Sequence, residues 1–349
     1  MSLSIPSTMW SLVARKYCSP AGYEVIELPV PKIKRPDEVL IKMYAGAINT
    51  FDPQVASGMF KLLAPPMKFP IKIGAEGSGV VAAIGPGVKT LKVGDTVYGM
   101  PFSRPMDPSD MPGFCSDYAV CRESLLLPKP ANLSFEEAAA LPGGVVTTIQ
   151  CINRGLELMG EPGGSLEGKT VFVSAALGAM GSLACEIFKN VYGAQKLIAT
   201  ASTPKVPLVK ELLPGGVVDE VVDYKTQDVV KTVGAGTVDF VYDTQWDLYK
   251  RFPLAKPDSG VVVTIAAIPP SQTLKVVMGE IPFWVSWLAD LAQLYYREDL
   301  EKAGEIIALG KVKPVLTVIS RDDLEAAKTA MDKVAAGKGG LGKLVIKIV

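Results

Sequence analysis

A short segment rich in small residues could bind the pyrophosphate of a dinucleotide. Residues 171–181 read Val-Phe-Val-Ser-Ala-Ala-Leu-Gly-Ala-Met-Gly, which predicts a strand, then a turn, then a helix. The small residues of the turn are Ala175, Gly178 and Gly181. Such a turn lets the backbone approach a pyrophosphate without interference from Cβ atoms, and the helix that follows offers free N–H groups and a positive dipole end. The alternative is that these small residues serve packing only.

The end of the next predicted strand favours NADPH over NADH. Residues 199–205 read Ala-Thr-Ala-Ser-Thr-Pro-Lys, and no acidic residue occurs between positions 186 and 211. An NAD site usually has Asp or Glu at this strand end, where it binds the 2′-hydroxyl of the ribose. The hydroxyls of Ser202 and Thr203 and the ammonium of Lys205 are instead suited to a 2′-phosphate. The alternative for Lys205 is an ordinary solvated loop lysine.

The sequence contains no histidine, and this excludes several kinds of chemistry. Histidine is the commonest general base and the commonest zinc ligand, so a Ser-His-Asp or Cys-His hydrolase is excluded in its usual form. The cysteines are odd in number, widely spaced and without a CxxC pair, which indicates reduced thiols and a cytoplasmic location rather than a disulfide framework or a Cys-rich zinc lobe. They are Cys18, Cys115, Cys121, Cys151 and Cys185.

Length and composition predict a globular protein of two domains. The chain has 349 residues, of which 48% are hydrophobic and 21% charged. Lys plus Arg and Asp plus Glu number 36 each, so there is no basic excess for a nucleic acid. The N-terminus does not read as a signal peptide. The most apolar late stretch, 281–294, is interrupted by Asp290, is too short to span a bilayer and predicts a buried or half-buried helix.

The first 140 residues predict a β-rich domain. Short β-branched runs alternate with Gly and Pro turns, which is typical of a small barrel or sandwich. Ser134 followed by Glu137 predicts a helix start, with the helix continuing to Leu141 and breaking at 142–144. The predicted strands cover residues 24–28, 38–44, 79–84 and 95–98.

The second half predicts a doubly wound α/β domain. From residue 170, near-continuous apolar runs alternate at first with helical patterns, which indicates a parallel sheet covered on both faces. The last segment, 311–349, returns to β-like runs around one helix at 322–336, as if completing the first domain. The predicted parallel strands cover residues 170–175, 196–201, 220–224, 238–243 and 260–266.

Several short segments follow one another in a characteristic order and spacing over nearly the whole length of the sequence. They are Ala-Ile-Asn-Thr-Phe-Asp at 47–52, Gly-Ala-Glu-Gly-Ser-Gly at 74–79, Val-Gly-Asp-Thr-Val-Tyr-Gly at 93–99, Ala-Ala-Ala-Leu-Pro at 138–142, the turn described above, Val-Asp-Tyr at 222–224 and Gly-Lys-Leu-Val at 342–345. With these segments the sequence resembles the medium-chain dehydrogenase/reductase superfamily, in its zinc-free quinone oxidoreductase and enoyl reductase branch. The resemblance implies a GroES-like catalytic domain at 1–140 and 311–349 and a Rossmann NADPH-binding domain at 141–310. A monomer or homodimer is expected.

The family pattern also implies roles for individual residues. Asn49 and Thr147 are expected near the nicotinamide as catalytic residues. Lys205 lies one position from the usual lysine of the zinc-free branch. The residues expected to bind the pyrophosphate are Gly178, Ala179, Met180 and Gly181, and those expected around the 2′-phosphate are Ser202, Thr203, Lys205 and Tyr224.

Two departures from related enzymes bear on the chemistry. Zinc-dependent members bind the metal through Cys, His and Cys, and the aligned positions here are Asn49, Ala75 and Gly143, so no metal is expected. Many enoyl reductases of this branch have a tyrosine where this chain has Phe60, which cannot donate a proton. Water, Tyr44 or Tyr242 are the alternatives that remain for protonation.

The resemblance implies an NADPH-dependent reductase that transfers a hydride to a small molecule with an activated C=C bond (an enone or enoyl thioester) or to a quinone. One alternative is an enoyl reductase acting in trans with a polyketide synthase or acyl carrier. Another is a redox-inactive member that binds NADPH in a repurposed role. The proline- and methionine-rich loop at 100–113 is expected either to lie near the substrate cleft or to be an ordinary surface loop. The aromatic segment at 281–296 is expected either to line the substrate pocket or to serve as core or subunit contact.

Overall fold

The computed structural model describes residues 5–59, 61, 68–101, 113–245, 248–265, 286–287, 297–338 and 340–349. The chain forms two compact units, each considered by itself below. The first comprises Met1–Gly143, Leu294–Ala308 and Leu316–Val349, and the second comprises Gly144–Gln293 and Leu309–Val315.

The first unit is built around the long strand β3 (Glu38–Ile48), which lies at the centre of its larger sheet. Apolar side chains of β3, among them Val39, Ile41 and Met43, are fully buried and pack in one core cluster with Val97 and Phe114. The strand order is β15 (Leu316–Ser320), β16 (Lys343–Lys347), β3, β5 (Glu76–Ile84), β6 (Thr96–Gly99) and β8 (Leu126–Pro128), with β7 (Tyr118–Arg122) also paired to β3.

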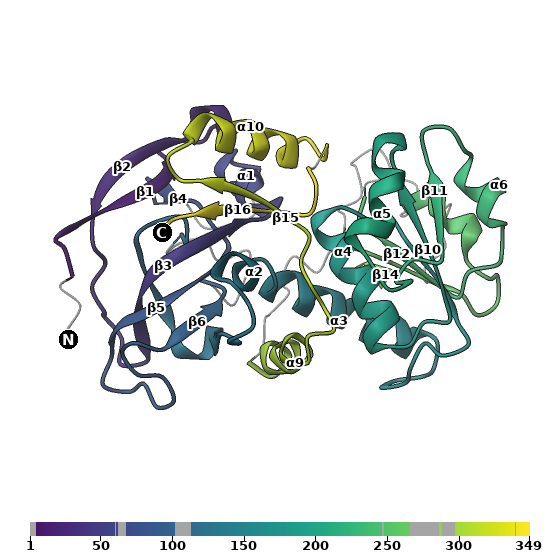
Figure 1. Cartoon of the computed structure of the whole chain (residues 1–349), viewed down its shortest axis with the longest axis horizontal. Helices are drawn as coiled ribbons and strands as arrows, with labels where there is room; N and C mark the ends of the chain where they lie inside the picture. Colours follow the sequence, from purple (N-terminus) through teal and green to yellow (C-terminus); the bar gives the residue numbers. More distant parts are fainter. Residues whose placement is uncertain are drawn as a thin grey trace. The chain divides into compact units, whose positions relative to one another are not determined.

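A smaller sheet and short helices complete this β-rich unit (Figure 1). Its strands follow the order β2 (Glu24–Pro29), β1 (Thr8–Ala14) and β4 (Ile71–Lys72). Helix α10 (Leu324–Ala335) buries Ala327 and Met331 in the core cluster that also contains residues of β1 and β16. The predicted β-rich domain is therefore confirmed, and residues 316–349 of the predicted return segment belong to it, whereas residues 311–315 group with the second unit.

The predicted helix start at Ser134 is confirmed, but the break after it is shorter than expected. Ser134 and Glu137 form a reciprocal capping box at the start of α2 (Phe135–Ala139). Pro142 then begins the long helix α3 (Pro142–Leu158) instead of continuing a loop. Proline is well suited to a first helical position, because its fixed φ fits a helix and its missing N–H would have no intrahelical partner there.

Helix α9 (Arg297–Ala308) groups with the first unit, whereas the sequence places it in the second domain. The guanidinium of Arg297 donates to the carbonyl oxygen of Leu126 at 2.8 Å. A Cβ added at Gly304 would lie 2.7 Å from the side chain of Leu127, so this helix packs closely on β8. An amphipathic pattern shows that one face of a helix is buried but not which domain buries it.

The second unit contains a parallel six-stranded sheet of Rossmann type. Its order, with the first strand in the middle, is the doubly wound order expected for a dinucleotide-binding fold, which confirms the predicted fold class. The order is β11 (Glu220–Asp223), β10 (Lys196–Ala201), β9 (Thr170–Val173), β12 (Phe240–Asp243), β13 (Val261–Thr264) and β14 (Ser286–Trp287).

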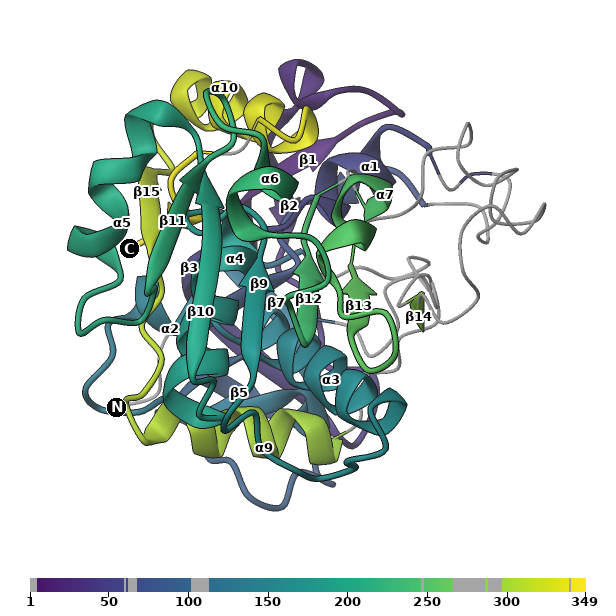
Figure 2. The same cartoon turned by 90° about the vertical axis from the view of Figure 1, so that its right-hand side faces the viewer.

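Helices lie on both faces of this sheet (Figures 1 and 2). On one face, α6 (Val229–Val233) packs on a cluster that includes Phe172 and Val241. On the other, α3 approaches so closely that a Cβ at Gly155 would overlap the ring of Phe240. Successive residues of β12 therefore pack on opposite faces of the sheet, one against α3 and the next against the cluster under α6, as expected for a strand buried on both sides.

The late apolar segment differs from its predicted helix where the structure describes it. Ser286 and Trp287 form β14, which pairs in parallel with β13. A short apolar run is compatible with either a buried helix or a buried strand, and pairing with β13 decides it here. The rest of 281–296 and most of the loop at 100–113 lie outside the described residues. Among the described helices, none is long and apolar enough to span a membrane.

A buried carboxylate fixes the segment that leaves the second unit. Glu186, the last residue of α4 (Ala179–Glu186), is 6% exposed. It accepts a hydrogen bond from the backbone N–H of Lys313 at 2.6 Å, and the side chain of Asn190 donates to the carbonyl oxygen of Lys311 at 3.0 Å. Burial raises the pKa of Glu186 to about 7, although the Lys313 contact opposes the rise.

We expect Glu186→Gln to reduce the loss of stability with rising pH. The folded chain holds the Glu186 proton more tightly than the unfolded chain, so between about pH 4.5 and pH 7 the free energy of unfolding falls as pH rises. Glutamine keeps an oxygen for Lys313 and cannot ionise. Across this pH window, the free energy of unfolding of the variant should rise by up to about 3 kcal/mol relative to that of the wild type. Urea unfolding at several pH values measures it.

The matched control for this measurement is Glu211→Gln, which changes an exposed glutamate of the same unit. Its pH dependence should follow that of the wild type. A Glu186→Gln curve parallel to the wild-type curve would show that Glu186 ionises in the folded chain as easily as in the unfolded one.

Candidate functional site

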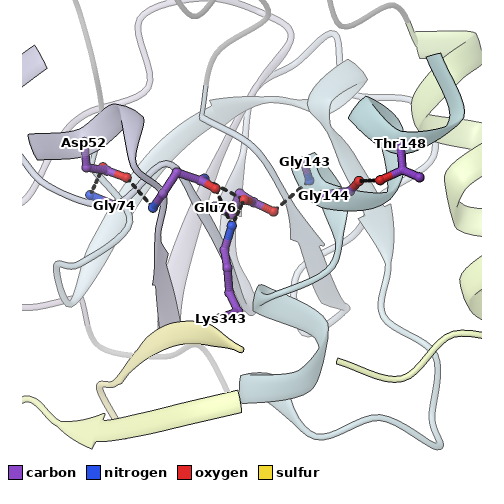
Figure 3. Close-up of polar contacts among 8 residues, drawn as sticks. Asp52, Gly74, Glu76, Gly143, Gly144, Thr148 and Lys343 are labelled. Atoms are coloured by element: carbon purple, nitrogen blue, oxygen red, sulfur yellow. Dashed lines mark hydrogen bonds and ion pairs between the residues drawn. The ribbon is translucent and has the colours of Figure 1, made fainter. Parts of the chain in front are cut away.

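Four residues of the first unit meet in a buried polar cluster, which we call the Glu76 cluster: Asn49, Glu76, Gly143 and Lys343 (Figure 3). The carboxylate of Glu76 accepts hydrogen bonds from the Asn49 amide at 2.6 Å, from the Lys343 ammonium at 2.7 Å and from the Gly143 backbone N–H at 2.7 Å. The ammonium of Lys343 also donates to the amide oxygen of Asn49. Both ends of the Asn49 amide are therefore held by charged groups.

Sheet register brings these residues together from distant parts of the sequence. In the pairing of β3 with β5, Ala47 lies opposite Glu76. In the pairing of β3 with β16, Ile48 lies opposite Leu344, so Asn49 and Lys343 follow one step beyond. Because β3 lies between β5 and β16, Asn49 has the carboxylate on one side and the ammonium on the other.

Asp52 fixes the turn that carries Asn49. Its carboxylate accepts from the backbone N–H of Asn49 at 2.8 Å and from that of Gly74 at 2.9 Å. Gly74 has φ +110°, and a Cβ there would meet the backbone N of Cys115, so glycine is required. Burial raises the pKa of Asp52 to about 6, although both backbone hydrogen bonds and the Lys343 charge oppose the rise.

The Glu76–Lys343 ion pair is almost completely removed from solvent. Glu76 is 1% exposed and Lys343 is 2% exposed, whereas Asn49 is only partly buried. Burial of two charges is favourable only when each is compensated by its partner and by further hydrogen bonds, and both conditions are met here. The sequence motif at 342–345 marked the region, but nothing in the sequence alone placed the Lys343 ammonium against Asn49.

The positions that align with zinc ligands offer no such ligands in this cluster. Ala75 and Gly143 have no donor side chain, and Asn49 is bound to both charges. Across the described ranges, no group of three His, Cys, Asp or Glu residues is placed to hold a metal ion.

Thr147, the other residue expected near the nicotinamide, lies on α3 within the second unit and is half-buried. Its neighbour Thr148 is fully buried and donates its hydroxyl hydrogen bond to the carbonyl oxygen of Gly144 at 2.8 Å (Figure 3). Asn49 and Thr147 thus belong to different units.

The predicted dinucleotide turn lies between β9 and α4, at the switch point of the sheet. A Cβ at Gly181 would overlap the carbonyl oxygen of Ala175, and one at Gly178 would lie 3.2 Å from it. In the described structure no side chain caps the N-terminus of α4, so its first N–H groups are left for a ligand or water. The turn therefore has room for a pyrophosphate. The residues expected to bind it, Gly178, Ala179, Met180 and Gly181, form the end of this turn and the start of α4.

Ala175 occupies an unusual backbone conformation. Its φ is +56°, in the left-handed region, and it is the one non-glycine residue of the described chain with positive φ. The side chain of Thr200 accepts from its N–H at 3.0 Å, and the carbonyl oxygen of Ala175 accepts from the N–H of Gly178 at 2.8 Å. The first position of the turn therefore has a conformation that glycine would adopt at lower cost.

Residues expected around the 2′-phosphate lie at two neighbouring strand ends. Ala201 pairs with Asp223, and the N–H of Tyr224 donates to the carbonyl oxygen of Ala201 at 3.2 Å. Ser202 precedes a short 3₁₀ helix, Thr203–Lys205. Tyr224 is 43% exposed and Lys205 is half-buried, and desolvation lowers the pKa of Lys205.

Asp223 is an acidic residue in this region that the sequence interpretation missed. Its carboxylate accepts a hydrogen bond from the hydroxyl of Thr203, which lowers its pKa, and another from the N–H of Lys225 at 3.0 Å. It ends β11, the third strand of the sheet in sequence, whereas the acidic residue of an NAD site usually follows the second strand. Only the pairing of β10 with β11 brings it to Thr203.

The tyrosines considered as proton donors are poorly placed. Tyr242 is fully buried against Phe188, with ring centroids 5.6 Å apart, and burial raises its pKa well above the usual value. Tyr44 stacks on Phe135 and lies five residues before Asn49 on β3, about 17 Å away at the usual strand rise. Phe60, which stands in place of the usual tyrosine, lies outside the described residues.

Comparisons with known proteins agree with this architecture. A family model described as alcohol dehydrogenase GroES-like domain matches residues 35–131, and one described as zinc-binding dehydrogenase matches residues 218–346. The chain is 33% identical over 351 residues to a 2-methylene-furan-3-one reductase of Solanum lycopersicum, a match that covers 99% of this chain and 80% of the relative.

Two further matches extend the comparison. The chain is 32% identical over 317 residues to a chloroplastic NADPH-dependent alkenal/one oxidoreductase of Arabidopsis thaliana, covering 90% of this chain and 73% of the relative. The structure of the quinone oxidoreductase from Coxiella burnetii superimposes with a TM-score of 0.77 at 23% identity, covering 98% of this chain and 100% of that one. At this identity the last likeness concerns the fold.

We expect Ala175→Gly to raise the free energy of unfolding by about 1 kcal/mol, because it relieves the left-handed conformation of an alanine. Chemical unfolding of the isolated variant measures this gain. Ala176→Gly at the next position, which is fully buried, is the matched control and should lower stability. If both substitutions destabilised the chain equally, Ala175 would carry no backbone strain.

Proposed function

The chain is an oxidoreductase of the medium-chain dehydrogenase/reductase superfamily, and we propose that it is an NADPH-dependent, zinc-independent reductase of enones, enoyl thioesters or quinones. The observation that carries this proposal is the Glu76 cluster. Its buried positive charge is the ammonium of Lys343, and it lies among the positions that hold catalytic zinc in zinc-dependent members of the superfamily.

The chemistry of the donor set argues against zinc at these positions. A dication there would lie close to the Lys343 ammonium, and like charges repel strongly where water is excluded. The carboxylate that attracts a cation is already compensated by this ammonium. Alcohol oxidation depends on a Lewis acid that stabilises an alkoxide. Reduction of an activated C=C bond or a quinone is feasible without one, because the cofactor provides the difficult chemistry.

We propose that NADPH binds along the carboxyl edge of the Rossmann sheet. Gly178, Ala179, Met180 and Gly181 would hold the pyrophosphate at the N-terminus of α4, where no Cβ obstructs the backbone. Asn49 and Thr147 would lie near the nicotinamide, which supplies the hydride when bound.

The 2′-phosphate would be bound by Ser202, Thr203, Lys205 and Tyr224. The ammonium of Lys205 is half-buried, which strengthens an interaction with a phosphate. Asp223 opposes this preference, but its carboxylate is bound by the Thr203 hydroxyl and a backbone N–H. We infer that attraction of the 2′-phosphate to the Lys205 ammonium outweighs its repulsion by Asp223, so that NADPH is preferred over NADH.

Among acceptors, we propose an enone first. The names of two relatives denote a furanone reductase and an alkenal/one oxidoreductase, and each is at least 32% identical to this chain. A cytoplasmic location and a monomeric or homodimeric state are kept as predictions from the sequence, and so is an acyl-carrier partner for a thioester substrate.

The test of this function begins with NADPH and NADH titrations followed by nicotinamide fluorescence. NADPH consumption is then measured with an enone, a quinone and an enoyl thioester, each before and after metal chelation. We expect tight NADPH binding, weaker NADH binding and reduction that a chelator does not affect. Binding of neither cofactor would favour the repurposed, redox-inactive alternative, and loss of activity with a chelator would contradict zinc independence.

We expect Lys205→Ala to weaken NADPH binding about 10-fold, since one charge-assisted hydrogen bond contributes roughly 1.5 kcal/mol. NADH lacks the 2′-phosphate, so its affinity should not change. Fluorescence titration of both cofactors measures this selectivity. The control is Lys210→Ala, which removes an exposed lysine of α5 (Val206–Leu212). Equal losses for NADPH and NADH would show that Lys205 does not bind the 2′-phosphate.

A further inference from the structure

The buried Glu76–Lys343 ion pair needs a reason for its presence. Moving two charges out of water has a large desolvation cost, and replacing such a pair by neutral residues of similar volume is often neutral or stabilising. Stability alone therefore does not account for a pair that is 1% and 2% exposed. The feature that the pair does determine is the orientation of the Asn49 amide.

The hydrogen bonds define that orientation. The amide nitrogen of Asn49 donates to the Glu76 carboxylate, and its oxygen accepts from the Lys343 ammonium. A flipped amide would place its oxygen against the carboxylate and its N–H groups against the ammonium, so it is strongly disfavoured. The amide nitrogen has two N–H groups, and within the described ranges only one of them has a protein acceptor, the carboxylate of Glu76. Asn49 is also the only side chain of the cluster that is not fully buried.

Resting on the function proposed above, we propose that Asn49 is a catalytic residue whose second amide N–H binds the carbonyl oxygen of the acceptor, and that Glu76 and Lys343 are its positioning residues. The ammonium on the amide oxygen withdraws electron density and makes the N–H a stronger donor. A fixed donor of this kind stabilises negative charge that develops on oxygen during reaction. It takes the electrostatic role that a metal has in zinc-dependent relatives.

The reaction balances without a metal. Hydride, one hydrogen with two electrons, is added to the β-carbon of the enone, and the C=C electron pair moves to give an enolate with its charge on oxygen. The cofactor is oxidised to NADP⁺. A proton from solvent then adds to the α-carbon, so the products are the saturated ketone and NADP⁺. Asn49 acts on the enolate oxygen and neither gains nor loses a proton.

This role predicts different losses for different acceptors. An enolate concentrates its charge on one oxygen, whereas a quinone gives an aromatic anion that is intrinsically more stable. Removal of the donor should therefore slow enone reduction much more than quinone reduction. A merely structural role for the pair would lower both rates in the same proportion.

The first variant neutralises the pair by Glu76→Gln with Lys343→Met, which leaves no uncompensated charge. We expect urea unfolding at an unchanged or higher midpoint and an NADPH affinity within about two-fold of wild type. The kcat for the enone should fall about 100-fold, as for loss of one oxyanion donor, and that for the quinone less than 10-fold. The control neutralises a more exposed ion pair, between Glu136 of α2 and Lys347 of β16, by Glu136→Gln with Lys347→Met, and should change none of these values.

The second variant is Asn49→Ala, which leaves both charges paired. It should reproduce the loss on the enone, and combining it with the neutral pair should add almost nothing, because the positioning residues act through Asn49. If the double variant Glu76→Gln with Lys343→Met does not fold, Asn49→Ala alone provides the test. Its readout is the fold-loss of kcat for the enone divided by that for the quinone. Equal losses on the two acceptors, or a folded neutral pair with full enone activity, would overturn the inference.

Failure of the proposed function has a different signature. A wild-type chain that consumes NADPH with neither acceptor would overturn that function, and this inference with it. A wild-type chain that reduces both acceptors, with variants that lose nothing on the enone, would overturn only the role of the Glu76 cluster.

Discussion

The compensation of a buried carboxylate by a buried ammonium organises the first unit. Glu76 can lose its water only because Lys343, Asn49 and the Gly143 N–H supply donors, and these come from three separate stretches of the chain. Each donor is useful only if β5, β3, β16 and the start of α3 are in register. An error of one residue in either pairing would leave a charge unpaired, which is far more costly than a missed surface contact. The ion pair thus fits only the register that places Asn49 beside it.

Much of the architecture could be predicted because local patterns carry it. The strands around β9 to β13 are continuous apolar runs, and a parallel sheet buried on both faces requires such runs. The capping box at Ser134 is equally local. The unit to which α9 belongs and the pairing of the short strand β14 with β13 depend on distant parts of the chain, and neither periodicity nor propensity contains that information.

The candidate site also contains residues that the sequence identifies and residues whose contacts it does not reveal. Gly178 and Gly181 could be identified from their spacing, because the steric requirement of the turn is written in consecutive residues. Lys343 and Asp223 could not be assigned their contacts, since each meets its partner only through strand pairing. A lysine near the C-terminus reads as a surface charge until β16 places it beside β3. The sequence therefore indicates the turn at Gly178 and Gly181, but not the contacts of Lys343 and Asp223, which depend on strand pairing.

Both parts of the candidate site depart from the lowest-energy choice available to the chain. Ala175 has a left-handed conformation that glycine would adopt more easily. Lys343 is buried at a desolvation cost that a neutral residue would not have. In each case the surrounding structure compensates: Thr200 binds the N–H of Ala175, and Glu76 pairs with the ammonium. Local costs that a rigid framework sustains are typical of functional positions. The ion pair is the more informative of the two, because it fixes one orientation of a partly exposed amide, and orientation matters only to a group that must bind something else.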